Sequence, residues 1–334
     1  MYYRGILILL GLSLLTWMLS TYGLLHLPEG AVYDFFVQLT PKKEVATKNI
    51  LLITAKRQNN LQDEKQWLNL VKELQSLKAK QIVFSFFPEG AGPGFYLRAE
   101  KAQNIILGRS LDKSAQNSDA YALQKMPEKA KGHDLAWGVT ALPPVKYGIA
   151  RRQQLFFELG EKQVPSLVAR AAAARGRSLP KSEYFYVNFN GRSQGLAQIS
   201  VAQVLEGRLV PEFVEDKSVL IGFEPDPLSV GLSTPLSSGQ NGISLLTYQG
   251  YALDTLLAEK EIVFPPSWVN LLCILAVAGV GLVIYQLLSF GLAFWFTAIS
   301  LVFYLLLSWV LLFLVLIWPP VFEIVFTQIG RAHV

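Results

Sequence analysis

Residues Trp268–Phe322 read WVNLLCILAVAGVGLVIYQLLSFGLAFWFTAISLVFYLLLSWVLLFLVLIWPPVF, without one charged side chain. A helix crosses the hydrocarbon core of a bilayer with about 20 apolar residues. This stretch therefore holds two full spans and most of a third. We predict a C-terminal cluster of about three spanning helices over residues 268–328, at approximately 268–287, 290–310 and 312–328.

A second apolar run, Gly5–Leu25, also lacks charge. It is longer than the apolar region of a cleavable signal peptide, and Leu24–Pro28 contains no Ala-x-Ala site. We therefore predict one N-terminal spanning helix at 5–25 rather than a signal peptide. Arg4 precedes the run, which places the N-terminus in the cytoplasm by the positive-inside rule. Residues 28–266 are then expected outside the cytoplasm.

The middle region has the composition of a globular domain, and its pattern predicts an α/β fold. Asn49–Thr54 and Gln81–Phe87 are apolar runs typical of buried strands, and between them an amphipathic helical stripe covers 67–77. Strand, helix and strand predict a parallel βαβ unit with a right-handed crossover. Further alternation favours a mixed sheet. We expect 135–142 to pair antiparallel with 153–159, and 111–131 to be irregular.

Composition argues against several functions. The net charge is only +5, and the charges are interspersed, so a nucleic-acid surface is not expected. Cys273 is the single cysteine, so no disulfide framework can form. The three histidines, His26, His133 and His333, share no motif with one another or with the cysteine. We therefore predict no metal, no cofactor and no catalytic residue in the sequence given.

One segment has the character of a ligand site. Glu224, Asp226, Ser233 and Thr234 follow the predicted strand 217–222, and ligands of open α/β sheets bind beyond the carboxyl ends of strands. The alternative is a proline-braced loop that seats the last helix of the domain. The basic pair Arg151-Arg152 is a further candidate for ligand binding, with a solvated edge as its alternative.

A glycine-rich loop, Gly90–Phe95, also follows a predicted strand. It lacks the Lys-Ser/Thr pair of a P-loop and the spacing of a dinucleotide fingerprint. Pro93 removes one backbone donor that a phosphate would need. A plain turn is the favoured interpretation, with phosphate binding as the alternative.

Taken in order, these segments resemble the second class of the CHASE domains, the cyclase/histidine-kinase-associated sensory extracellular domains of bacterial receptors. The resemblance covers Val32 to about Gln328. The matching pieces are Val32-Tyr33-Asp34, Asn49–Ile53, Ile82–Phe87, Pro165–Ala169, Val187–Gly191, Lys217–Gly222, Asp226, Thr234-Pro235 and Gly242-Ile243.

The resemblance implies one N-terminal spanning helix, an extracytoplasmic domain, typically three C-terminal spans and a cytoplasmic output domain. The sequence also departs from the family. Ala55-Lys56-Arg57 and Ser85-Phe86 stand where members often carry acidic residues, and Tyr147–Arg152 replaces an Asp-Gly-x-x-Arg-Arg turn. A ligand that needs those carboxylates is therefore not expected here.

The last six residues, Ile329–Val334, are unusual. The codons ATC GGA AGA GCA CAC GTC encode them, and this string resembles the start of a common sequencing adapter. We expect 329–334 to be an artefact and the natural protein to continue into an output domain, a cyclase or a kinase by family habit. An ordinary short cytoplasmic tail is the alternative.

Together these features predict a sensory input module of a bacterial transmembrane receptor, a multi-pass protein of the inner membrane with its soluble domain outside the cytoplasm. Its partners would be the lipid bilayer and a small-molecule or protein signal that the sequence does not name. A homodimer is left open. The alternative is a non-signalling envelope membrane protein whose domain binds another protein.

Overall fold

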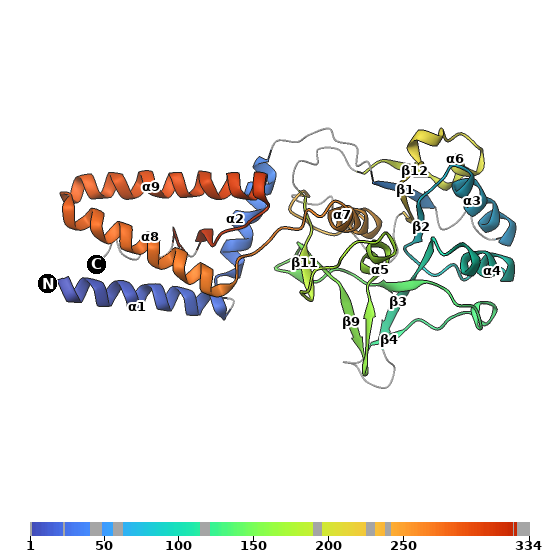
Figure 1. The fold of residues 1–334 in the computed structure, drawn as a ribbon, viewed down its shortest axis with the longest axis horizontal. Coiled ribbons are helices and arrows are strands. Elements are labelled where there is room, and N and C mark those ends of the chain that lie inside the picture. The colour runs from blue at the N-terminus through green and yellow to red at the C-terminus, as the bar shows by residue number, and fades with distance from the viewer. Residues whose placement is uncertain are drawn as a thin grey trace. The chain divides into compact units, whose positions relative to one another are not determined.

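The computed structural model describes residues 2–22, 24–40, 49–55, 63–113, 121–189, 196–224, 231–237, 242–322 and 324–325. The chain forms two compact units (Figure 1). A helical unit combines residues 1–40 with 262–334, and an α/β unit holds residues 41–261. Residues 28–40, which were expected in the outer domain, belong to the helical unit.

The α/β unit is built around a seven-stranded sheet with the order β12-β1-β13-β2-β3-β4, in which β5 also pairs with β3. Each pairing is parallel except β3 with β4, so the predicted mixed sheet is confirmed. The strands are β1 (Ile50–Ala55), β2 (Gln81–Phe84), β3 (Ile105–Lys113), β4 (Tyr121–Leu123), β5 (Trp137–Thr140), β12 (Gln198–Ser200) and β13 (Ser218–Phe223).

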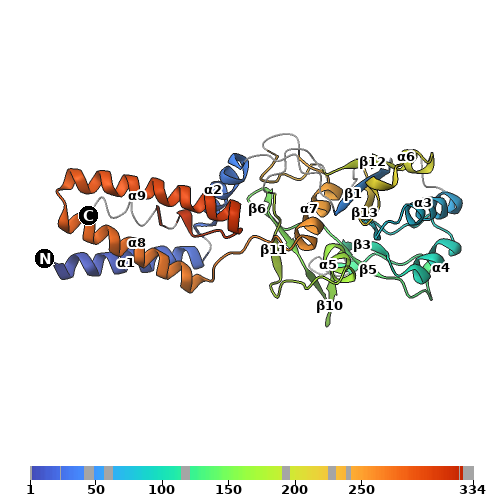
Figure 2. The same cartoon turned by 45° about the horizontal axis from the view of Figure 1, so that its top comes forward.

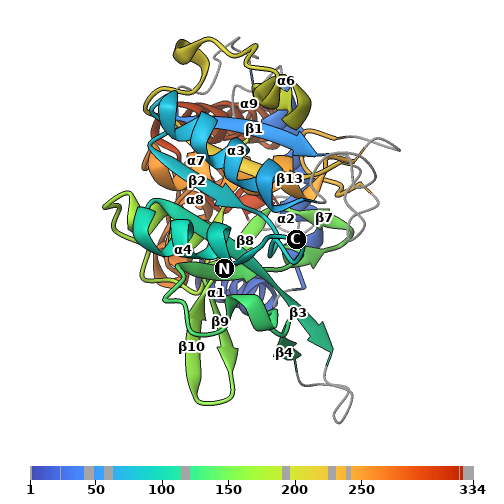
Figure 3. The same cartoon turned by 90° about the vertical axis from the view of Figure 1, so that its right-hand side faces the viewer.

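Helices cover both faces of this sheet (Figures 1 and 3). The core on one face joins alternate strand residues to α3 (Glu64–Ser76), α4 (Pro93–Ala102) and α6 (Val201–Leu205). The other face is covered by α5 (Leu167–Ala174) and α7 (Leu245–Leu257). Because both faces are buried, β1 reads as a continuous apolar run, ILLITA, rather than an alternating one.

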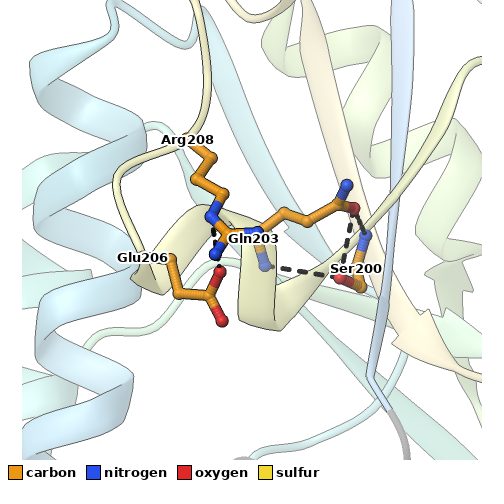
Figure 4. Close-up of polar contacts among 4 residues, drawn as sticks. All are labelled: Ser200, Gln203, Glu206 and Arg208. Atoms are coloured by element: carbon orange, nitrogen blue, oxygen red, sulfur yellow. Dashed lines mark hydrogen bonds and ion pairs between the residues drawn. The ribbon is translucent and has the colours of Figure 1, made fainter.

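Local signals in the sequence set the ends of these helices. Ser200 starts α6 with a capping box: its Oγ accepts from Gln203 N at 3.3 Å, and Gln203 Oε1 accepts from Ser200 N at 2.9 Å (Figure 4). Gly207 follows with a φ of 68°, the left-handed conformation that closes a helix. An exposed ion pair, Glu206 with Arg208, spans that end at 2.9 Å.

Three small antiparallel ladders complete the α/β unit (Figure 2). The expected pairing of 135–142 with 153–159 is wrong, because β5 instead extends the main sheet and β9 pairs with β10 across a turn at Gly160. Residues 111–113 and 121–123 form a ladder rather than an irregular excursion. The ladder strands are β6 (Val145–Lys146), β7 (Ile149–Ala150), β8 (Arg152–Gln154), β9 (Phe156–Leu159), β10 (Lys162–Pro165) and β11 (Tyr184–Tyr186).

The helical unit contains α1 (Tyr2–Thr21), α2 (His26–Leu39), α8 (Ser267–Leu287) and α9 (Phe290–Val310). Within the described residues, α8 and α9 are long and apolar enough to cross a membrane. The bent pair α1 and α2, at 80° to each other, counts as a third span if it is taken as one. Large apolar side chains stay exposed along α9, as lipid contact requires: Trp295, Ile299, Val302, Phe303 and Leu306.

The third predicted C-terminal span, 312–328, does not form as one helix. Residues up to Val315 continue α9 as a π-helical turn, and Leu316 then adopts a left-handed conformation with φ of 61°. Helical backbone resumes only after Pro319-Pro320, at residues 321–322 and 324–325, while 326–328 lie outside the described residues. A uniformly apolar sequence hides this break, because hydropathy does not register a backbone reversal.

At Gly138 the backbone of β5 packs closely against the start of α5. A Cβ atom there would lie 2.7 Å from Leu167 Cα and 2.8 Å from Ser166 O, both backbone atoms that cannot turn away. We expect Gly138→Ala to cost about 1–3 kcal/mol through overpacking and to lower the thermal unfolding midpoint of the full chain in detergent. Gly279→Ala in α8 is the matched control, because nothing lies within 4 Å of its added Cβ. Equal midpoints for the two variants would contradict the close contact.

Candidate functional site

The best-connected polar group of the helical unit is the Glu29 carboxylate on α2. Its Oε1 accepts hydrogen bonds from Trp318 Nε1 at 2.5 Å and from Val321 N at 3.2 Å, and its Oε2 accepts from Phe322 N at 2.7 Å. Backbone donors at the start of a helical segment have no partner within the helix. The carboxylate supplies that partner from 293 residues away in the sequence, with the strength of charge-assisted hydrogen bonds.

Aromatic packing reinforces this contact. Trp318 is buried and meets the rings of Tyr33 and Phe36 edge-on, with centroid distances of 5.3 and 5.7 Å. Glu29, Tyr33 and Phe36 are spaced i, i+4 and i+7, so they lie along one face of α2. The indole is therefore held by its N–H at one residue and by its ring at two others.

A backbone bridge ties the start of the α8 segment to the end of α9. Val263 N donates to Leu316 O at 2.8 Å, and Trp318 N donates to Val263 O at 3.0 Å. We call Glu29, Tyr33, Phe36, Val263 and Trp318 the junction. It joins the segment that leads into the α/β unit, the segment that leaves it and the segment that follows α9.

The predicted ligand residues fall in two places: Glu224 lies at the end of β13, whereas Ser233 and Thr234 lie next to Arg151. Glu224 follows β13: its N–H donates to Ala55 O at 3.1 Å, and its carboxylate accepts from the side chain of Gln198 on β12. Glu224 therefore links β13 to β1 and β12 by hydrogen bonds. Asp226 lies outside the described residues.

Ser233 and Thr234 belong to a tight turn. Thr234 is buried, its N–H donates to Ser237 Oγ at 2.8 Å, and its Oγ1 lies 3.2 Å from the same oxygen. Ser233 O accepts from Ala150 N at 2.8 Å, which brings this turn next to Arg151. These internal contacts fit the braced-loop alternative, and a ligand at this turn stays a prediction.

Arg151 and Arg152 lie with Lys146 in what we call the basic cluster. Arg151 Nη1 donates to Lys146 O at 3.3 Å, and the Arg152 guanidinium lies 5.7 and 5.6 Å from the ring centres of Tyr184 and Tyr186. Burial, and then the positive charges of Arg152 and Arg151, hold the pKa of Lys146 below its ordinary value. The cluster therefore presents concentrated positive charge.

The donors of the glycine-rich loop serve the protein itself. Gly94 N donates to Glu64 Oε1 at 2.7 Å, so a carboxylate from α3 caps the start of α4. A Cβ at Gly92 would lie 2.0 Å from the Glu64 carboxyl carbon, so any larger residue there would displace the Glu64 side chain from this cap. This internal cap fits the plain-turn interpretation, and sequence reasoning missed it because the partner comes from another helix.

His133 also has a partner. Its Nδ1 lies 2.7 Å from Glu100 Oε2, and Asp134 N donates to Glu100 Oε1 at 3.3 Å. These contacts, the one with His133 foremost, hold the pKa of Glu100 below its usual 4.5. In the part of the chain that the structure describes, no group of three His, Cys, Asp or Glu side chains could hold a metal ion.

A family model described as the CHASE2 domain matches residues 7–283 of the chain. The chain belongs to the CHASE2 family. This match confirms the resemblance found in the sequence. CHASE2 is a sensory domain of signalling receptors. No curated protein and no solved structure matches the chain.

The matched region begins within α1 and ends within α8. The CHASE2 match therefore takes in Glu29, Tyr33, Phe36 and Val263 of the junction, whereas Trp318 lies beyond it. Sequence reasoning used Tyr33 only as part of the resemblance and missed Glu29 and Trp318. A lone carboxylate directly after an apolar run, and a tryptophan before Pro319-Pro320, are the signals that could have found them.

Removing the Glu29 carboxylate should open the junction. In Glu29→Ala three donors lose their acceptor, at a cost of about 1–3 kcal/mol. We expect faster chymotrypsin cleavage after Phe322, whose N–H loses its acceptor, in the detergent-solubilised chain, measured by mass spectrometry of the fragments. Glu206→Ala is the control, since its exposed pair with Arg208 contributes little. Identical cleavage rates would show that Glu29 does not hold the segment.

The Glu100–His133 pair predicts a pH dependence. Because the folded-state pKa of Glu100 is depressed, its contribution to stability is present above the ordinary pKa of 4.5 and is lost as pH falls through the lower folded value. Thermal midpoints measured from about pH 6 to about pH 3 should fall less steeply for Glu100→Gln than for the unmodified chain. Parallel curves for the two proteins would contradict the assignment.

Proposed function

We propose that the chain is the extracytoplasmic sensory input module of a bacterial transmembrane receptor, which relays a signal through its C-terminal helices to a cytoplasmic output domain. Membership of the CHASE2 family supports the sensory role. Two helices able to cross a membrane support the location. The proposal includes a small-molecule or protein signal and the ligand-binding residues predicted from the sequence.

The junction is the observation that carries the relay. α2 precedes the first strand of the α/β unit, Val263 follows its last residue at 261, and Trp318 follows α9. A displacement of either end of the sensory domain would therefore change the contacts of the junction. A signal needs only to bind one arrangement of these segments more tightly than the other to shift their populations.

The bridge between Val263 and Ile317 supports a specific topology. It places the open ends of the α8–α9 hairpin side by side, so a hairpin that crosses the bilayer has its Ser289 turn on the opposite side. A chain that reaches the cytoplasm must then cross once more after Trp318. The helical backbone that begins at residue 321, with Glu29 at its start, is in the position of such a crossing.

Reporter fusions test this topology. With the sensory domain outside, alkaline phosphatase joined after Lys131 should be active, and the same enzyme joined after Ser289 should be inactive. Green fluorescent protein at the two sites should give the inverse result and serves as the internal control. Phosphatase activity at Ser289, or fluorescence at Lys131, would overturn the proposed orientation.

The output domain is tested by reading the source gene beyond Gln328. A cyclase or kinase domain there, as the family habit suggests, would favour the receptor. A stop codon would instead favour the envelope protein whose domain binds another protein. Catalysis by the present residues is not proposed.

A further inference from the structure

The β6–β7 hairpin exposes apolar side chains at its tip. Tyr147 and Gly148 form the turn, both with positive φ, 54° and 78°, which is typical of a tight two-residue hairpin. Leu142, Val145 and Tyr147 are each about half exposed, at 51%, 51% and 50%. Val145 and Tyr147 belong to the hairpin and Leu142 precedes it by a few residues, and exposed apolar side chains grouped in this way favour contact with a surface rather than with water.

The basic cluster lies on the β6–β7 hairpin and directly after it. Lys146 lies in β6 beside the tip, its ammonium group 5.6 Å from the Tyr147 ring centre, and Arg151 and Arg152 follow β7. Cations flanking exposed apolar and aromatic side chains are the combination that interfacial anchors use: the cations meet anionic headgroups and the apolar groups enter the boundary below them.

A short stretch of chain links this surface to α8. Val187 N donates to Arg151 O at 3.0 Å, and the neighbouring Asn188 donates through Nδ2 to Lys260 O at 3.0 Å. α8 begins at Ser267, only seven residues after Lys260. A fully extended segment of that length spans at most about 25 Å. The cluster is thus tethered by a short segment to a helix apolar enough to lie in a bilayer.

We propose that the β6–β7 hairpin and the basic cluster form a docking surface for anionic lipid headgroups. In this proposal Arg151 and Arg152 bind lipid headgroups rather than a soluble ligand. A small soluble anion would make no use of the exposed apolar side chains of Leu142, Val145 and Tyr147. Docking restrains the sensory domain against the bilayer. The inference rests on the proposed membrane insertion of α8.

The test uses the full chain reconstituted into phosphatidylcholine vesicles, with or without phosphatidylglycerol. An environment-sensitive dye is placed at Val145→Cys in a Cys273→Ser background, and the lipids carry a nitroxide quencher at headgroup depth. We expect at least about twofold more quenching in the anionic vesicles, because the attraction is electrostatic. Raising the salt to about 1 M should remove the difference, since the Debye length falls to about 3 Å.

Lys146→Gln in the labelled protein should reduce the quenching in anionic vesicles. A dye at Glu161→Cys, exposed on the β9–β10 turn, is the matched control and should respond to neither lipid. Equal quenching at position 145 in both vesicle types, or none, would overturn the docking surface. Competition by inorganic phosphate at constant ionic strength would also overturn it, in favour of a soluble anion site.

A separate sample labelled at the native Cys273 distinguishes the two proposals. Cys273 lies within α8, so an acyl-chain quencher should reach its dye in both vesicle types. If it does not, the membrane insertion fails. If it does and position 145 stays unquenched, only the docking surface fails.

Discussion

The Glu29 carboxylate is the acceptor on which the helical unit depends. Backbone N–H groups at the start of the helical segment after α9 need partners, because none lies within that segment. Both oxygens of Glu29 are used, by the Trp318 indole and by the N–H groups of Val321 and Phe322. The Glu29 carboxylate is partly buried, and its charge strengthens these hydrogen bonds, so the charge and the donors stabilise each other.

The α/β unit follows a different constraint, the burial of both sheet faces. Its first strand, β1, lies in the interior of the sheet beside β13, which is among its last elements. α7 covers that pair, with Leu52 close to Gly250. The first strand of the sensory domain and one of its last are thereby joined directly by a parallel ladder.

Much of this architecture could be predicted from the sequence. The strands and helices of the sheet follow from apolar runs and from the 3.6-residue stripe of α3, because burial leaves its period in the sequence. The strand order could not be predicted. ILLIT at β1 and SVLIG at β13 are equally apolar, and nothing in either shows that β13 inserts between β1 and β2. The antiparallel pairing expected for 135–142 was wrong for the same reason.

The candidate site was less predictable than the fold. Glu29 and Trp318 are 289 residues apart, and neither carries a motif. The break within 312–328 was not predicted, because Leu316 adopts a left-handed backbone that leucine rarely shows. Arg151 and Arg152 were singled out as cations, but their relation to the β6–β7 hairpin required the register of the small ladders. The chemical character of each segment can be read from the sequence, whereas the pairing of residues far apart in the chain cannot.

The place of β1 also governs the order in which the domain can assemble. Leu52 pairs with Gln198 on one side and with Leu220 on the other, so both hydrogen-bonding edges of β1 wait for chain made at least 146 residues later. Contacts of such long sequence separation form slowly, and an unpaired apolar strand is prone to aggregate in the meantime. During synthesis β1 must therefore be kept from pairing with other chains until β12 and β13 have been made.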